Sequence, residues 1–184
     1  MDGVCTDFAS AGIRANGRDP ADVLATWNQS CLGEFLPYKV MGLDSNVYWE
    51  AIAQQGESFW ISLQEYEWYP KLICSLWEIG EVMFLTSGIY APGSLSGKLI
   101  WLQRRFGHNF QGYVFTAKKY LLANPWSILI DDYERNVTEF CQYGGRAVLF
   151  PQIWNSNCMI HNQLEYTLES VKQFVNEMKV PEHR

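Results

Sequence analysis

Short apolar runs alternate with helical patterns in the second half of the chain, and this alternation constrains the fold more than any other feature. The runs cover residues 82–85, 113–115, 127–130 and 147–150. Apart from Ser127 at the start of the third run, these residues are apolar or aromatic, which is typical of strands that are covered on both faces in a parallel sheet. We therefore predict an α/β fold, a three-layer sandwich in which helices cover both sides of a parallel sheet.

The segments between these runs have helical spacing. Leu95, Leu99, Leu102 and Phe106 recur at steps of four and three, and Gly107 closes that helix. Further helices are predicted from about 134 to 143, where two glycines follow, and over 164–178 at the end of the chain. Residues 68–78 are predicted to form the helix that leads into the first of the four strands.

Residues 17–63 follow a different pattern, with short helical pieces, turn residues and many aromatic side chains. Strand alternation is not evident there, so we expect a small helical cap over one end of the sheet. The chain has 184 residues, of which 48% are apolar, enough for one domain with an insertion. We assign residues 1–16 and 64–184 to the α/β core and residues 17–63 to the cap.

Charge and cysteine usage limit the classes of partner. The net charge of −6 argues against binding to nucleic acid polymers or to anionic membranes. The five cysteines are scattered without paired spacing, and neither a membrane span nor a signal peptide is evident. We expect a cytoplasmic protein that binds a small molecule. The sequence leaves the oligomeric state open, a homodimer included.

Residues suited to phosphate chemistry follow three of the predicted strands. They comprise two hydroxyls, two lysines and two carboxylates: Thr86 and Ser87, Lys118 and Lys119, and Asp131 and Asp132. Ligands of open α/β sheets bind beyond the carboxyl ends of the strands. Hydroxyls and lysine bind phosphate oxygens, and carboxylates bind Mg²⁺. The three strand ends together therefore predict a site for a phosphate beside a magnesium ion.

The order of these residues resembles that of the haloacid dehalogenase (HAD) superfamily of phosphatases. The chain reads Asp2-Gly3-Val4 near its start, then Thr86-Ser87, then Lys119, then Asp131-Asp132. It is most similar to the 5′(3′)-deoxyribonucleotidase branch, with its phage and bacterial relatives. The segments 96–102 and 144–155 support the likeness, which covers most of the chain and is weakest in the cap. The resemblance implies a Rossmann-like core sheet.

The resemblance also implies catalytic roles. Asp2 is expected to protonate the leaving 5′-oxygen and then to activate the attacking water, while its backbone carbonyl contacts Mg²⁺. Thr86 and Lys119 are expected to hold the phosphoryl oxygens, with Ser87 as a further contact to the substrate. The expected product pair is a nucleoside and phosphate.

The resemblance also implies which residues bind the metal ion and which contact the base of the nucleotide. In the family's acidic motif the second acid is the principal metal ligand, so Asp132 is expected to bind Mg²⁺, with Asp131 in support. Phe8 matches the position of an aromatic residue against the base. Trp60 and Trp49 of the cap are expected to complete a stacking slot.

One part of the family pattern has no counterpart. The family's nucleophilic aspartate lies two residues before Asp2, and the sequence begins one residue before it. The strand that carries this nucleophile lies between the strands that end at Thr86 and Asp131. Because a missing central strand would leave buried backbone groups unpaired, we expect the protein to begin several residues upstream of Met1.

The implied function is magnesium-dependent hydrolysis of (deoxy)nucleoside 5′-monophosphates through an aspartyl-phosphate. Two alternatives stay open: an inactive nucleotide-binding or interaction protein with this fold, and a phosphatase of the same family with a non-nucleotide substrate. Simpler interpretations also exist for single residues. Asp131 and Asp132 could form a turn and helix cap, Lys119 could be a solvated cation with Lys118 in its role, and the cap aromatics could be core.

Overall fold

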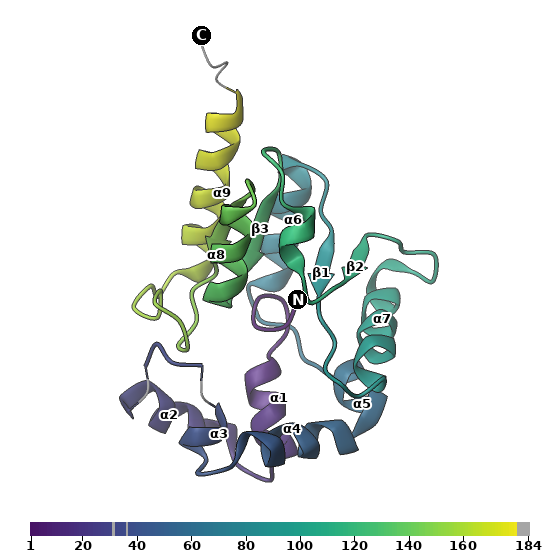
Figure 1. The fold of residues 1–184 in the computed structure, drawn as a ribbon, viewed down its shortest axis with the longest axis vertical. Coiled ribbons are helices and arrows are strands. Elements are labelled where there is room, and N and C mark those ends of the chain that lie inside the picture. The colour runs from purple at the N-terminus through teal and green to yellow at the C-terminus, as the bar shows by residue number, and fades with distance from the viewer. Residues whose placement is uncertain (31, 36, 180–184) are drawn as a thin grey trace.

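The computed structural model describes residues 1–30, 32–35 and 37–179 as a mixed α/β fold (Figure 1). Strand β1 (Phe84–Thr86) pairs with β2 (Tyr113–Phe115), and β3 (Ile128–Asp131) pairs with β4 (Arg146–Leu149). Both pairings are parallel, as predicted, and each joins strands separated by a helical crossover. Within the described residues the four strands form two separate two-stranded sheets.

The helices of the second half lie where the periodicity predicts them. They are α6 (Tyr69–Ile79), α7 (Gly93–Phe106), α8 (Glu134–Gln142) and α9 (Gln163–Lys179), with a short 3₁₀ helix η1 (Lys119–Leu122). Gly107 follows α7 with a φ of 93°, a left-handed conformation that glycine adopts without strain and that ends the helix. The predicted elements of this half are therefore confirmed to within a few residues.

The first third of the chain is helical, as predicted for residues 17–63, and its first helix precedes that range in the part assigned to the α/β core. It contains α1 (Phe8–Ala15), α2 (Pro20–Ser30), α3 (Pro37–Val40), α4 (Ser45–Gln54) and α5 (Gly56–Ile61). Helix α1 packs against α2 and α4, and these helices gather at the end of the molecule opposite α9 (Figure 1). Helix α5 packs against α7, so the helical region is joined to the sheets mainly through this helix pair.

Aromatic side chains fill much of the core. Trp27, Trp60 and Trp101 are at most 1% exposed, which accounts for part of the aromatic excess as packing. Trp77 and Trp126 differ, since they are 47% and 76% exposed. Four cysteines are free thiols, and the fifth, Cys31, lies outside the described residues. In the described part of the chain no helix combines the length and apolar character that crossing a membrane requires.

The buried face of α7 contains a charged residue. Ser94, Gly97, Lys98 and Trp101 are buried on this face, whereas Leu95 is 42% exposed. Only 2% of Lys98 is exposed, and a lysine is rarely buried to this degree without a partner for its charge. Helix α7 therefore directs a cation into the interior, beside the carboxyl end of β1.

Candidate functional site

The loop before α1 holds Asp2 against the ends of the strands. Gly3 has a φ of 73°, and a Cβ atom there would lie 2.1 Å from Oδ2 of Asp132, so the loop approaches that carboxylate through glycine. Gln152 donates from Nε2 to the Gly3 carbonyl oxygen at 2.5 Å, which ties the loop to the segment after β4. Thr6 forms a bridge with Asp2 and lies 3.5 Å from its Oδ1 atom.

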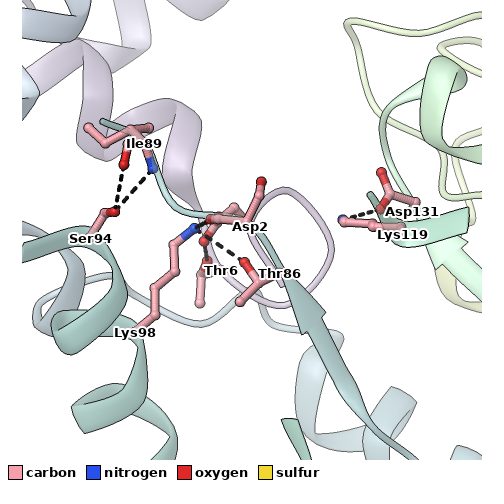
Figure 2. Close-up of polar contacts among 9 residues, drawn as sticks. Asp2, Thr6, Thr86, Ile89, Ser94, Lys98, Lys119 and Asp131 are labelled. Atoms are coloured by element: carbon pink, nitrogen blue, oxygen red, sulfur yellow. Dashed lines mark hydrogen bonds and ion pairs between the residues drawn. The ribbon is translucent and has the colours of Figure 1, made fainter. Parts of the chain in front are cut away.

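Lys98 joins Asp2 to the end of β1 (Figure 2). Its Nζ atom lies 2.5 Å from Asp2 Oδ2, donates to Thr86 Oγ1 at 3.2 Å, and also donates to the Ser87 carbonyl oxygen. The ammonium group lies 4.5 Å from the ring centroid of Trp60, within cation–π range. Burial is the largest single effect on Asp2 and acts to raise its pKa, but Lys98, the N-terminal ammonium group and Lys119 together outweigh burial, so the net pKa lies below the usual value.

A second ion pair lies across the site, between Lys119 and Asp131 (Figure 2). Lys119 is buried, whereas Lys118 is exposed, so Lys119 is the lysine that reaches the strand ends. Asp131 also accepts hydrogen bonds from the Tyr133 backbone N–H at 3.0 Å and from Asn136 Nδ2 at 2.9 Å. Both oxygen atoms of the Asp131 carboxylate therefore already have hydrogen-bond partners.

Asp132 differs from its neighbour because its side chain has no lysine partner among the described residues. Its Oδ2 atom accepts a hydrogen bond of 2.9 Å from Trp154 Nε1, and its carbonyl oxygen accepts one of 2.9 Å from Asn155 Nδ2. Burial, followed by the charge of Asp131, raises the pKa of Asp132 well above its ordinary value. A cation beside this carboxylate would offset both effects.

A single cavity of about 240 Å³ collects the predicted site residues. Its lining includes every residue predicted from the sequence as catalytic, substrate-binding or metal-binding: Asp2, Phe8, Trp60, Thr86, Ser87, Lys119, Asp131 and Asp132. These residues come from the N-terminal loop, helices α1 and α5, the 3₁₀ helix η1 and the ends of β1 and β3. The volume lies below the range of roughly 300–1,000 Å³ for ligand pockets, so it suits a small ligand.

The aromatic residues of this cavity are also packed on one another. The Phe8 ring lies between Trp49 and Trp60, with ring centroids 5.8 Å and 5.6 Å away and interplanar angles of 26° and 18°. Phe8 is 8% exposed and Trp60 is 1% exposed. Because both faces of the Phe8 ring are covered, a base cannot enter between these rings unless they separate.

The described residues do not form a complete metal site. No group of three or more His, Cys, Asp or Glu side chains that could hold a metal ion occurs among them. Asp2 and Asp131, two of the three predicted ligands, are paired with lysines. Asp132 retains an uncompensated carboxylate. The donor set therefore fits Mg²⁺ only in part, and we derive no chemical step through the metal.

Sequence reasoning missed Lys98. The segment 93–99 superficially resembles a phosphate-binding loop, but it has leucine where the magnesium-binding hydroxyl is needed and one residue too few between its two glycines. A signal was nevertheless present, since Lys98 lies three residues before Trp101 and four before Leu102, at the spacing of a common helix face. A lysine on an apolar helix face indicates a buried ion pair or a ligand contact.

Comparison with known proteins does not assign the chain to a family. The chain matches none of the protein-family models and none of the curated proteins with which it was compared.

Proposed function

We propose that the cavity binds the phosphate of a nucleoside 5′-monophosphate, with deoxynucleotides preferred, and that the chain is a magnesium-dependent 5′-nucleotidase of the HAD type. The observation that carries the proposal is the convergence of Lys98, Thr86 and Asp2 in one hydrogen-bonded group beside Lys119. Hydroxyl and ammonium donors at the end of a parallel strand are suited to phosphate oxygens.

The charges around the cavity support a phosphate together with a cation. The charged side chains that line it are two lysines and three aspartates, which sum to −1. A phosphate dianion would add further negative charge to this buried group. A divalent cation at Asp132 would offset that charge and favour the ionised form of the carboxylate. Magnesium dependence is part of the proposal on this ground, with Asp132 as the ligand.

Asp2 is suited to proton transfer once phosphate is bound. Burial favours the protonated form of Asp2, and Lys98 is the largest of the cationic contributions that together hold the pKa of Asp2 low in the free protein. Phosphate oxygens compete with Asp2 for Lys98, so binding weakens the ion pair and the effect of burial then dominates. The pKa of Asp2 rises, and its carboxyl can carry a proton to the leaving oxygen.

The covalent route through an aspartyl-phosphate needs a further aspartate immediately before Met1, which residues 1–184 do not contain. The chain by itself is therefore proposed to bind nucleotide and to hold the acid–base group. We also propose that the two small sheets are the halves of one three-layer Rossmann-like sandwich.

Calorimetry on the chain tests the binding. Deoxynucleoside 5′-monophosphates are expected to bind more tightly with Mg²⁺ than without it, and more tightly than inorganic phosphate or a sugar phosphate. Asp132→Asn should remove most of the magnesium effect, while Asp22→Asn on the exposed part of α2 should leave it intact. Equal binding of nucleotide and sugar phosphate would overturn the substrate assignment, and an unchanged magnesium effect in Asp132→Asn would remove that residue from the site.

A second candidate function is nucleotide binding without hydrolysis. Asp2 and Asp131 favour this function because each is paired with a lysine. Neither carboxylate is therefore free to attack phosphorus. A chain lengthened by an apolar strand that ends in aspartate just before Met1 separates the two functions. Release of phosphate from a bound nucleotide supports the enzyme, and tight binding without release supports the inactive binder.

A further inference from the structure

Two partly exposed aromatic side chains line the cavity at the strand ends: Phe35 in the cap region and Tyr133 after β3. They are 36% and 45% exposed, respectively. Most of the other aromatic residues in the lining are buried, among them Trp27, Tyr48 and Trp154. Phe35 and Tyr133 therefore lie where the cavity opens to solvent, which is the position for the outer part of a ligand.

The rings that the sequence predicts as the base-stacking slot already contact one another. Trp49 and Trp60 cover both faces of Phe8. Trp49 is half-buried, but one face of its ring contacts Phe8, and Tyr48 packs against it at an interplanar angle of 83°. A base would have to separate these rings, whereas the two rings at the opening present surface that is already exposed.

The Phe35 and Tyr133 rings form an open corner. Their centroids lie 6.0 Å apart, and the ring planes are inclined at 57°. A planar group that lies parallel to the Tyr133 ring is therefore inclined at the same angle to the Phe35 ring. One contact is then an offset stack and the other is tilted toward edge-to-face, and aromatic pairs prefer both to a face-to-face sandwich. The corner thus suits a flat heteroaromatic group, such as the base of a nucleotide.

The backbone of Tyr133 is fixed beside the carboxylates of the site. Tyr133 directly follows Asp132 in the chain. Its N–H donates to Asp131 Oδ1 at 3.0 Å, and its carbonyl oxygen accepts a hydrogen bond of 3.0 Å from the Asn136 N–H. The ring is therefore held next to the charged end of the cavity, so a single ligand can contact both the charged groups and the ring.

Phe35 is held by Trp154. The two rings meet edge to face, with centroids 6.1 Å apart and an interplanar angle of 74°, and Trp154 Nε1 donates to Asp132 Oδ2 at 2.9 Å. Trp27 Nε1 donates at 2.9 Å to the carbonyl oxygen of Glu34, the residue before Phe35. Both rings of the corner are therefore supported by contacts with buried residues, and a ligand that binds there loses little affinity to ordering of the protein.

We propose that Phe35 and Tyr133 form the platform on which the base of the bound nucleotide stacks, and that this platform requires an aromatic base without selecting among the bases. The inference rests on the proposed function, because it names where the base of that substrate binds. Stacking uses the flat face common to every base rather than the edge that distinguishes one base from another. Purine and pyrimidine nucleotides should therefore bind with affinities within about tenfold of each other, whereas loss of the base should cost about tenfold or more.

Nuclear magnetic resonance on the chain of 184 residues detects the stack directly, because a base shifts the resonances of a ring on which it lies. Isotopically labelled Phe and Tyr side chains are observed while dAMP, dTMP or 2-deoxyribose 5-phosphate is added. Both nucleotides are expected to shift the ring resonances of Phe35 and Tyr133, and the sugar phosphate is expected to leave them nearly unchanged. Shifts at Phe8 without shifts at Tyr133 would place the base in the predicted slot and overturn the proposal.

Substitutions measure how much the platform contributes. Tyr133→Leu and Phe35→Leu each remove one ring and keep an apolar side chain. Each should lose about three- to tenfold in affinity for both nucleotides and keep the affinity of the parent for 2-deoxyribose 5-phosphate, as measured by calorimetry. Tyr133→Phe keeps the ring and should bind like the parent. Tyr143→Leu is the matched control, since Tyr143 is 60% exposed and lies outside the cavity. If circular dichroism shows that a leucine variant is unfolded, the resonances of the parent protein decide.

The inference and the proposed function fail in different ways. If the nucleotides bind more tightly than the sugar phosphate and both leucine variants keep that difference, the platform is overturned and the function stands. Equal affinities of nucleotide and sugar phosphate would overturn both. If no phosphate compound binds, the proposed function is overturned, and 2′-deoxyadenosine at millimolar concentration then tests the platform. Shifts at Phe35 and Tyr133 would support it, and their absence would overturn it. A preference of more than about tenfold for one base would overturn the broad base tolerance.

Discussion

Lys98 and Asp2 show how individual residues can shape a site through burial. Lys98 is 2% exposed and meets three oxygen acceptors, so its charge is compensated inside the protein. The side chain of Asp2 is 26% exposed, which leaves one side of the ion pair open to a ligand. A buried cation with an anion that can be displaced is suited to phosphate capture.

Replacing Lys98 by methionine keeps most of the side-chain volume and removes the charge. We expect Lys98→Met to weaken phosphate and nucleotide binding by roughly ten- to a hundredfold, the value of one charge-assisted hydrogen bond. Calorimetry measures this loss, and Lys118→Met, a change at an exposed lysine, is the control. Equal affinities of the two variants would exclude Lys98 from the phosphate site.

The Cys5 thiol has a pKa that predicts its reactivity. Burial raises that pKa to about 11 from an ordinary value of 9.0, because the apolar surroundings disfavour the thiolate. At about pH 8, iodoacetamide should modify the exposed Cys74 and Cys141 and leave Cys5 intact, as read by mass spectrometry of peptides. Early modification of Cys5 would contradict its burial.

The same shift gives a stability effect with a definite sign. The folded protein favours the neutral thiol, so the contribution of Cys5 is fully present below pH 9.0 and is lost as the pH rises through about 11. The free energy of unfolding should therefore fall over this alkaline interval, and Cys5→Ala should reduce the fall. An identical fall in both proteins would assign the effect to other groups, such as the buried Tyr48.

At the scale of elements, the packing of α5 on α7 connects the helical region to the sheets. Gly97 lies at this contact, where a Cβ atom would come within 2.6 Å of the Glu57 carbonyl oxygen and 2.7 Å of Trp60 Cβ. Trp60 and Lys98 depend on the same contact, since they belong to these two helices. The close approach of the helices therefore positions part of the cavity.

Gly97→Ala should force α5 and α7 apart. We expect a loss of about 1–3 kcal/mol in the free energy of unfolding, because the clash involves backbone that cannot rotate away. Gly80→Ala at the end of α6 is the matched control, since a Cβ atom there would meet nothing within 4 Å and the φ of −179° suits alanine. Denaturant unfolding measures both variants, and equal stability of the two would show that the helices yield without cost.

At the scale of the whole molecule, the two sheets are joined through helices and loops rather than through a common ladder. The parts of each strand should therefore differ in protection. We expect the amides of Leu85 and Ile130, which lie on the strand edges away from β2 and β4, to exchange faster than those of Phe84 and Phe150, which donate to neighbouring carbonyls. Hydrogen exchange with residue resolution checks this, and slow exchange at all four amides would indicate that these two edges are covered in solution.

The sequence by itself predicted the strands, the helices and the parallel pairing, because apolar periodicity is a local property that survives in most folds. It also predicted that Thr86, Lys119 and Asp132 would meet, since the carboxyl ends of parallel strands share one edge, and the family resemblance added Asp2; the cavity that they line is consistent with this expectation. The predicted elements bring these residues together, and this prediction does not require knowing which side chains pair with which.

Only the tertiary structure decided how the charges pair and which surfaces stay open. The partner of Asp2 lies 96 residues away, and Lys119 takes Asp131 rather than a free position in the cavity. Phe8 is covered on both faces by tryptophans from two other helices. Such pairings depend on burial and on the distances between segments that are remote in sequence. The spacing of residues along the chain gives no information about either. The division of the described strands into two sheets has the same origin, because the packing of the whole fold decides which strands lie side by side.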